Sequence, residues 1–446
     1  MKHSIHRPRN RPLGLAELIA IAIGGMVGGG IFSILGISVA LIGNLTPIAI
    51  FIGGMTALLA AYSYVKLGVY YKDEGATYSF IKKTFPKSHY AASSVGWYII
   101  FGYISTLALY AYTFSAYTLS NTEYSHDEWV RKAVAWAVIW VFAGINLWSV
   151  KGMGKIEDLM VYTKIVLLIL ISIVLIRHGQ TDLKTFAETM VRDFEQSGLF
   201  KILIVAAVTF VAYEGFQLVI NAVNEMVDPD KNIPRAIYSA IILVIITYVV
   251  LAIGALLAIP KEQIIRDKEY ALAAGAQQIL GPVGAAIVIA GAILATSSAI
   301  SSTVFGSSRQ MAVIAEDGYF PAFLTKRRNH IPYNAIITMS VLASLLILTG
   351  GLEMILEFGS ITFLLVSWLV AYANHKIRTK TRSSAVITTL AVTGLGISGL
   401  LILYYEFTHK PERMWFTLSI YAILSLGAWL YAKRNERKHS EAVRRG

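Results

Sequence analysis

Long apolar runs separated by short polar segments dominate this chain of 446 residues. Windows of about 20 apolar residues, the length that crosses a bilayer as a helix, occur twelve times along it. The pattern predicts an all-α polytopic membrane protein with twelve transmembrane helices. The expected spans are 13–42, 46–65, 91–119, 133–150, 156–177, 200–225, 235–259, 282–311, 334–350, 354–373, 384–404 and 414–432.

Composition agrees with this picture and removes several functional classes. The chain is 56% hydrophobic and 15% charged, whereas soluble domains carry about 25% charged residues. It has no cysteine, which excludes disulfides and cysteine-ligated metals, and its histidines show no metal-ligand spacing. We therefore expect no metal and no cofactor. The basic start "MKHSIHRPRNRP" precedes an apolar run too long for a signal sequence, so no cleaved signal peptide is expected.

The basic residues predict the orientation in the membrane. If the N-terminus is inside, the inside segments hold 27 of the 39 Lys and Arg residues and the outside segments hold 11. The remaining one, Lys164, lies within a span. Loops rich in Lys and Arg stay on the cytoplasmic side. We therefore expect a multi-pass protein of the plasma or inner membrane with both termini in the cytoplasm. The net charge of +12 then reflects these loops and does not indicate nucleic-acid binding.

Two spans are interrupted at matching places. "IGGMVGGGIF" (23–32) lies within the first span, and "FVAYEGFQ" (210–217) lies within the sixth. Each opens a group of five spans, and paired interruptions of this kind indicate an inverted-repeat transporter with a midplane binding site. The expected organisation is a tail (1–12), a first repeat (13–177), a second repeat (200–373), two extra helices (384–432) and a C-terminal tail (433–446).

Interrupted helices offer specific chemistry. Unwound backbone inside a bilayer is tolerable only where it faces protein or a water-filled cavity. Its N–H groups can bind an anion beside a helix N-terminus, and its carbonyl groups can hold a cation. A zwitterion that carries both charges on one carbon suits two such breaks. The alternative is that the glycines only let helices pack closely, as small residues do in membranes.

The fifth span contains one charge, Lys164, about 15 Å from the expected cytoplasmic end of the span. Ionisable residues at that depth are functional candidates, and a lysine that gains and loses a proton can replace a bound cation. The alternative is a structural lysine paired with a buried carboxylate, for which Glu214 is the first partner to test. Glu214 itself can bind the substrate amine, carry a proton or stabilise the unwound backbone.

The eighth span has a polar face. Ala299, Ser302 and Thr303 lie at positions i, i+3 and i+4 and therefore share one side of a helix. Hydroxyl groups there can coordinate a cation or accept a hydrogen bond from a lysine. The alternative is that they join helices by hydrogen bonds, as Ser and Thr do in membranes.

Three segments resemble the amino acid–polyamine–organocation transporters, a superfamily with the leucine-transporter fold. They are "VGGGIF" (27–32), "FVAYEGFQLVINAVNEMVDPDKNIPRAI" (210–237) and "SSRQMAVIAEDGYFPAFL" (307–324). "GKIEDLMVYTK" (154–164) is similar to prokaryotic proton-coupled members, in which a lysine replaces the second sodium ion. The resemblance implies a 5+5 inverted repeat with helices 1 and 6 discontinuous. Glu214 departs from many relatives, which carry an apolar residue or glycine there.

The resemblance also implies site residues. Amides of the first break would hold the substrate carboxylate, carbonyls of the second would meet its amine, and Phe210 would cover the site. The implied substrate-binding residues are Gly28, Gly29, Gly30, Phe210, Val211, Tyr213, Glu214, Gly215 and Tyr103. The implied proton-coupling residues are Lys164, Gly24, Val27, Ala299, Ser302 and Thr303.

The expected function is secondary active, proton-coupled transport of amino acids by alternating access, with small neutral or aliphatic substrates. The alternatives are a proton-independent amino acid or polyamine exchanger and a non-transporting membrane sensor. We expect no enzyme, since no nucleophile–base pair, metal cluster or phosphate loop is found. The expected partners are an amino acid, protons and the lipid bilayer, with no nucleic acid and no obligate protein partner.

Overall fold

The computed structural model describes residues 13–148, 153–267, 269–328 and 331–445. The expected N-terminal tail, residues 1–12, lies outside the described residues. The described part of the chain is almost entirely helical, and its only extended pairings are two isolated bridges. One bridge pairs Leu13 with Met226 and so ties the start of the first helix to the segment that follows the second interruption. The helical class predicted from the apolar runs is confirmed.

Sixteen α-helices and three short 3₁₀ helices make up the described residues. The α-helices are α1 (Leu15–Met26), α2 (Gly30–Ile42), α3 (Thr46–Tyr71), α4 (Ala76–Thr84), α5 (His89–Leu119), α6 (Glu128–Trp148), α7 (Met153–Arg177), α8 (Leu183–Thr209), α9 (Leu218–Asn221), α10 (Pro229–Ala258), α11 (Lys261–Arg266), α12 (Ala271–Glu316), α13 (Tyr333–Thr349), α14 (Leu352–Lys376), α15 (Ala385–His409) and α16 (Pro411–Arg445). The 3₁₀ helices are η1 (Gly43–Leu45), η2 (Phe210–Tyr213) and η3 (Ala322–Thr325).

Both predicted interruptions are present. The first expected span consists of α1 and α2, which are separated by residues 27–29. The sixth consists of α8, η2 and α9, with turns at residues 214–217. Ten helical stretches are long and apolar enough to cross a membrane, and α1 and α13 are shorter apolar helices. The expected twelve spans therefore each coincide with helical structure.

Two long helices bend at a glycine. Gly198 within α8 has φ 68°, and Gly281 within α12 has φ 68°. Side chains with a Cβ atom rarely adopt this left-handed conformation. The bend divides α8 into residues 183–197 and 199–209, and it divides α12 into residues 271–280 and 282–316. The predicted spans 200–225 and 282–311 coincide with the part that follows each bend.

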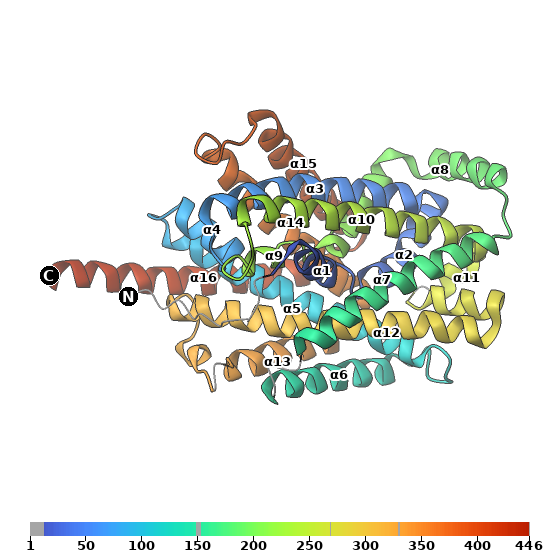
Figure 1. Cartoon of the computed structure of the whole chain (residues 1–446), viewed down its shortest axis with the longest axis horizontal. Helices are drawn as coiled ribbons and strands as arrows, with labels where there is room; N and C mark the ends of the chain where they lie inside the picture. The colour runs from blue at the N-terminus through green and yellow to red at the C-terminus, as the bar shows by residue number, and fades with distance from the viewer. Residues whose placement is uncertain (1–12, 149–152, 268, 329–330, 446) are drawn as a thin grey trace.

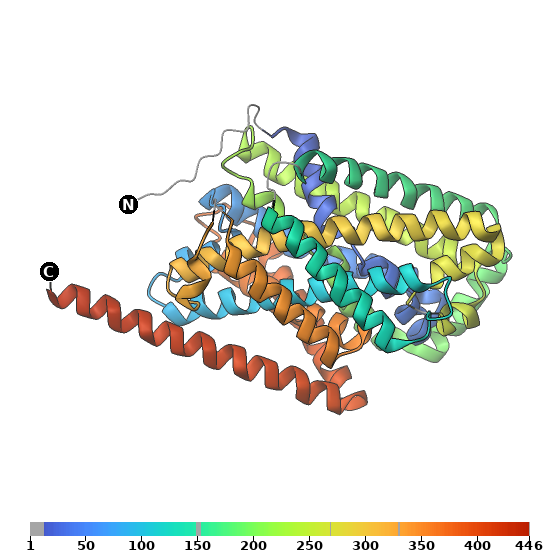
Figure 2. The same cartoon turned by 90° about the horizontal axis from the view of Figure 1, so that it is seen from below.

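The core of the bundle surrounds α5, whose residues are buried along most of its length. Helices α12, α14, α16 and α6 pack against it, while α10 packs against α3, α7 and α1. Figure 1 shows most helices running along the long axis, whereas α1 is seen nearly end-on. Figure 2 shows α1 from the side and α16 extending beyond the other helices toward the C-terminus.

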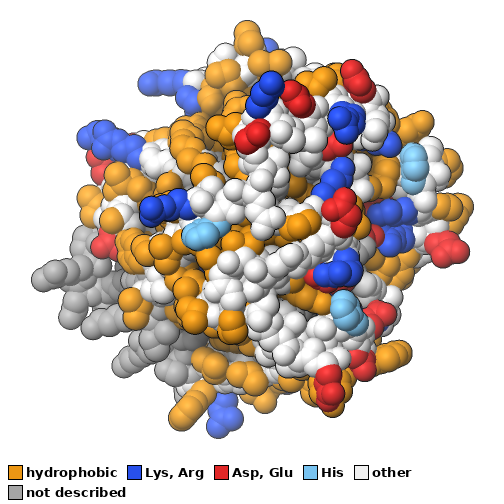
Figure 3. Space-filling model, turned by 90° about the vertical axis from the view of Figure 1, so that its right-hand side faces the viewer, with side chains coloured by type: hydrophobic (Ala, Val, Ile, Leu, Met, Phe, Trp, Pro, Cys, Tyr) orange, Lys and Arg blue, Asp and Glu red, His pale blue; other side chains and the backbone are white. Residues whose placement is uncertain are grey.

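Small residues allow this close packing, since lipid supplies no hydrophobic drive between helices. On α3, a Cβ atom at Gly53 would collide with Thr209 of α8, and one at Gly54 would lie 3.1 Å from the Tyr213 ring. These adjacent glycines bring α3 against the second interruption. The face of the molecule that lies away from the C-terminal end of α16 carries side chains of both charges among hydrophobic ones, as Figure 3 shows.

Candidate functional site

The two interruptions meet through their backbones. We call residues 27–29 the first break and residues 210–217 the second break. A Cβ atom at Gly25, in the last turn of α1, would lie 2.8 Å from the carbonyl oxygen of Gly215. Gly215 has φ 119°, a conformation that favours glycine. Only two residues without side chains allow this approach, so the glycine pair places the breaks in contact.

The last three carbonyl groups of α1 and that of its cap, Val27, all receive hydrogen bonds from side chains. A helix end leaves these groups without intrahelical partners. Lys164 donates to the carbonyls of Gly24 and Val27. The hydroxyl of Tyr110 donates to Gly25 at 3.4 Å, and that of Tyr248 donates to Met26 at 3.1 Å. The interrupted end of α1 is thus held by α5, α7 and α10 together.

Lys164 occupies the centre of this arrangement and is fully buried. Its Nζ lies 3.0 Å from the oxygen of Gly24, 2.5 Å from that of Val27 and 2.9 Å from Oγ of Ser298. The lysine therefore connects α7 to α1 and α12. The two carbonyls are those that the sequence analysis assigned to it.

On the polar face of α12, the residue that accepts a hydrogen bond from Lys164 in the described contacts is Ser298, beside the expected Ala299, Ser302 and Thr303. Ser298, which the sequence analysis did not select, gives the hydroxyl partner of Lys164. The hydroxyl of Ser302 donates to the carbonyl of Ser298 at 2.8 Å, and the carbonyl of Thr303 accepts a hydrogen bond from Ser307. Ala299 is buried and would lie 2.8 Å from a Cβ atom at Gly28.

Side chains fill the space in front of the three glycines. A Cβ atom at Gly28 would lie 2.7 Å from the ring of Tyr110, and one at Gly29 would lie 2.7 Å from Oγ1 of Thr113. Gly30 lies against Ala212 of the second break, at 3.0 Å by the same measure. Side chains of α5 and the backbone of η2 therefore pack directly against the three glycines.

The second break begins as the 3₁₀ helix η2, whose residues Phe210, Val211 and Tyr213 are all buried. The hydroxyl of Tyr213 donates to the carbonyl of Ile50 on α3 at 2.8 Å. Its ring packs against that of Tyr248, with centroids 5.5 Å apart. These contacts fix η2 between α3 and α10.

Glu214 follows η2 and is 2% exposed. Its Oε2 accepts a hydrogen bond from Gln217 at 2.8 Å, while Oε1 has no hydrogen-bond partner among the described residues. The hydroxyl of Ser367 lies beside this carboxylate outside hydrogen-bonding geometry. The hydrogen bonds of Lys164 described above run to α1 and α12, so Gln217, and not Lys164, donates to Glu214.

Gln217 joins the second break to α5. Its Oε1 accepts the N–H of Gly215 at 3.0 Å, and its Nε2 lies 3.4 Å from the hydroxyl of Tyr103. The ring of Tyr103 packs edge-on against Phe363 of α14, with centroids 5.7 Å apart. Tyr103 therefore contacts the second break through Gln217.

Five residues at this site were missed from the sequence: Tyr110, Thr113, Gln217, Tyr248 and Ser298. One signal could have found the first two, because Tyr103 and Tyr110 are seven residues apart on one face of a helix and Thr113 is three further on. Tyr248 and Ser298 lie on long helices that contain other tyrosine, serine or threonine residues, and the local sequence does not show which of these residues face the breaks.

Comparison with known proteins identifies the family and the fold. The profile of the family described as amino acid permease matches residues 13–429. An inner membrane transport protein of Escherichia coli is 29% identical over 433 residues, which cover 96% of this chain and 97% of that protein. An uncharacterized protein of Methanocaldococcus jannaschii is 27% identical and covers 89% of this chain and 90% of that protein.

More distant relatives include the large neutral amino acids transporter small subunit 2 of Oryctolagus cuniculus, 26% identical over 81% of this chain and 69% of that protein. Among solved structures, a manganese transporter of Eremococcus coleocola superposes with a TM-score of 0.57, covering 95% of this chain and 94% of that one. At 13% identity this likeness shows the fold alone. The resemblance found in the sequence is confirmed: the chain belongs to the amino acid permease family, whose relatives transport amino acids across membranes.

Proposed function

We propose that this protein transports amino acids by coupling their movement to protons, with Lys164 as the proton carrier and the two breaks as the substrate site. The observation that carries this proposal is the environment of Lys164. Its fully buried Nζ lies within hydrogen-bonding distance of two carbonyls of α1 and a hydroxyl of α12.

Proton counting supports a coupling role. An ammonium has three N–H donors, and all three have acceptors here. A neutral amine has two donors and no charge, so loss of the proton removes at least one of these bonds and weakens the others. Deprotonation therefore loosens the end of α1 from α7 and α12. Because α1 ends at the first break, the protonation state of Lys164 acts directly on the substrate site.

The substrate site of this proposal consists of the residues around the breaks. Gly30 begins α2, so N–H groups of its first turn can receive a carboxylate. Carbonyls of η2 can receive an amine, with Phe210 as the cover and Val211 and Tyr213 beside it. The surroundings are mainly apolar, which favours small neutral or aliphatic amino acids. Glu214, whose Oε1 has no hydrogen-bond partner in the described part of the chain, is the candidate contact for a positively charged group.

Transport would follow alternating access. Spans 1, 2, 6 and 7 would move against spans 3–5 and 8–10, with both termini in the cytoplasm. Proton-driven uptake by proteoliposomes tests the coupling. We expect Lys164→Ala to lose the pH dependence of uptake that the wild type has. Wild-type pH dependence in this variant would overturn the role of Lys164.

An exchanger that needs no proton gradient is the competing function. Counterflow, in which internal amino acid drives uptake of external amino acid at equal pH on both sides, separates the two. Uptake that depends only on counter-substrate, and never on the pH gradient, would favour exchange. The name of one relative, a transporter small subunit, indicates that it works with another subunit. We propose that this chain, which contains no cysteine, functions without an obligate protein partner.

A further inference from the structure

The hydroxyl group of Tyr248 lies between the two breaks and faces a carbonyl oxygen beside each. Tyr248 belongs to α10 and is fully buried. Its hydroxyl lies 3.1 Å from the oxygen of Met26, the last residue of α1, and 3.4 Å from that of Ala212 in η2. Its ring packs against that of Tyr213, with centroids 5.5 Å apart. Tyr248 therefore links the end of α1 to the second break through one polar atom.

One hydroxyl cannot serve both carbonyls well. A phenol has a single proton to donate, and both separations exceed the usual range of about 2.5–3.0 Å between two hydrogen-bonded oxygens. The oxygen of Met26 also accepts the N–H of Gly28 at 3.0 Å. An ammonium group has three donors and a charge, so it would bond to both oxygens at once and more strongly. We call the carbonyls of Met26 and Ala212 the acceptor pair, and this pair suits an ammonium better than a phenol.

The charged donor already present at the end of α1 is engaged elsewhere. The Nζ of Lys164 has hydrogen bonds to two other carbonyls of α1 and to a hydroxyl of α12, and these acceptors use all three donors of an ammonium. The side-chain donor to Met26 is the neutral hydroxyl of Tyr248. A neutral donor binds a carbonyl less strongly than a charged one, so a second ammonium would displace it.

The acceptor pair lies next to the start of α2. This helix begins at Gly30, and a Cβ atom at Gly30 would lie 3.0 Å from Cα of Ala212. N–H groups in the first turn of a helix favour an anion. An α-amino acid carries its ammonium and its carboxylate on one carbon atom. It therefore has one group for the acceptor pair and one for the neighbouring first turn of α2.

We propose that the hydroxyl of Tyr248 holds the place of the substrate ammonium. It donates to the acceptor pair before an amino acid binds, and the ammonium of the amino acid then takes over both carbonyls. Tyr248 is a positioning residue that keeps the breaks in register. It also restricts binding to ligands with a free ammonium, because a ligand without donors cannot replace the bonds that it displaces. The inference rests on the proposed function, since the acceptor pair belongs to the substrate site of that proposal.

Removal of the hydroxyl tests this role. Tyr248→Phe keeps the ring and leaves the acceptor pair short of a donor. The cost falls on the protein without substrate, because a bound ammonium supplies the missing donors. We therefore expect a lower melting temperature without ligand and, for amino acids, a Kd about fivefold lower than that of the wild type, which is the equivalent of one neutral hydrogen bond.

The measurements use the purified full-length protein. The standard amino acids are screened for uptake by proteoliposomes, and the Kd of each transported one is measured by equilibrium dialysis with tritiated ligand. The KM for uptake should fall with the Kd, while kcat should not rise, because a more tightly held substrate leaves more slowly. A purely structural role of Tyr248 would lower the melting temperature without lowering the Kd.

Two further replacements and one control complete the test. Incorporation of 4-fluorophenylalanine in place of Tyr248 fills the volume of the hydroxyl without a donor, and it should give the same low Kd even if Tyr248→Phe fails to fold. Incorporation of 4-aminophenylalanine restores a donor and should return the Kd to the wild-type value. The matched control is Tyr421→Phe on α16, which loses a hydrogen bond to Thr362 at 2.7 Å and should keep the wild-type Kd.

A Kd equal to or higher than that of the wild type in the folded variants without the hydroxyl overturns the role of Tyr248 and leaves the proposed function standing. A wild type that neither binds nor transports any of the amino acids overturns the proposed function, and this inference falls with it.

Discussion

Gly25 and Gly215 place the two breaks of this transporter in direct backbone contact, at a separation that admits no side chain on either residue. Gly25 lies two residues before the first break and Gly215 lies within the second. The contact means that the end of α1 and the turn after η2 cannot move independently. Movement at one break is therefore transmitted to the other, as the proposed alternating access and the proposed substrate site require.

Substitution of Gly215 should disrupt this contact. Gly215→Ala introduces a methyl group that would overlap the backbone of Gly25, in a conformation with φ 119° that alanine rarely adopts. Backbone strain of this kind costs about 1–3 kcal/mol, and the overlap adds to it. We expect a lower melting temperature and loss of amino acid binding.

The matched control is Gly399→Ala, a helical glycine with open space around its Cβ position. Alanine is favoured over glycine inside a helix by about 1 kcal/mol, so this variant should melt at the same temperature or higher. Equal melting temperatures for Gly215→Ala and Gly399→Ala would show that the breaks are not held together by the glycine contact.

Replacement of Lys164 should affect stability as well as coupling. Lys164→Met keeps most of the side-chain volume but leaves the carbonyls of Gly24 and Val27 without their donor. Each buried group left unsatisfied costs about 1–3 kcal/mol. We expect a clear fall in melting temperature, and a smaller fall for Ser298→Ala, which removes the serine hydroxyl and leaves both carbonyl partners of Lys164. Lys66→Met, at an exposed hydrogen bond to Arg382, serves as the control and should melt as the wild type does.

Tyr110 should control which amino acids reach the first break. Its ring covers Gly28, and its hydroxyl bonds to Gly25. Tyr110→Ala opens space above the glycines, so larger side chains should compete better for uptake than they do in the wild type. Tyr110→Phe keeps the ring and loses the hydrogen bond, so its selectivity should stay unchanged while its stability falls by about 1 kcal/mol.

Competition by a panel of amino acids measures this effect, and Phe114→Ala, one helical turn further along α5, is the matched control. A wild-type pattern of competition in Tyr110→Ala would mean that the ring does not limit the site.

Asp73 lies in the loop between α3 and α4, and its ionisation should make the stability of the protein depend on pH. Burial opposes its ionisation, but hydrogen bonds from Lys83 and from the N–H of Gly75 hold the pKa of Asp73 below its ordinary value. A lowered folded-state pKa contributes stability that is fully present above the unfolded value of about 4 and is lost as the pH falls through the folded value. We expect Asp73→Asn to melt below the wild type at pH 7, with the difference shrinking towards pH 3. An unchanged difference at pH 3 would contradict this account.

The membrane class, the two breaks and Lys164 could be predicted from the sequence because each is a local departure from an apolar run. A run of 20 apolar residues has one stable environment, and glycine clusters or a lysine within it are visible without knowledge of neighbours. Residues 27–29 and 210–217 indeed interrupt helices, and Gly24 and Val27 accept hydrogen bonds from Lys164.

Other features depend on how each helix is rotated and on what lies opposite it. Ser298 and Ser302 are one helical turn apart, and only the packing of α12 against α7 decided that Ser298 meets Lys164. Glu214 lies in the predicted break, yet its hydrogen-bond donor is Gln217.

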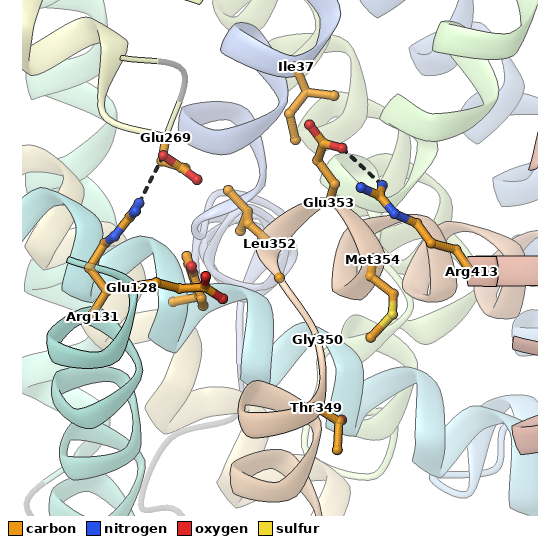
Figure 4. A pocket seen from close by; sticks show the side chains of 12 residues that line it. Ile37, Glu128, Arg131, Glu269, Thr349, Gly350, Leu352, Glu353, Met354 and Arg413 are labelled. Atoms are coloured by element: carbon orange, nitrogen blue, oxygen red, sulfur yellow. Dashed lines mark hydrogen bonds and ion pairs between the residues drawn. The ribbon is translucent and has the colours of Figure 1, made fainter. Parts of the chain in front are cut away.

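One cavity is lined by charged residues from four segments that are far apart along the chain, namely Glu128 and Arg131, Glu269, Glu353, and Arg413 (Figure 4). The sequence by itself determined the membrane-spanning architecture and the positions of the breaks, because the bilayer penalises every exposed polar group whatever the fold. Only the tertiary structure decided which side chains face one another, because helix rotation and the approach of distant segments follow from the packing of the whole bundle.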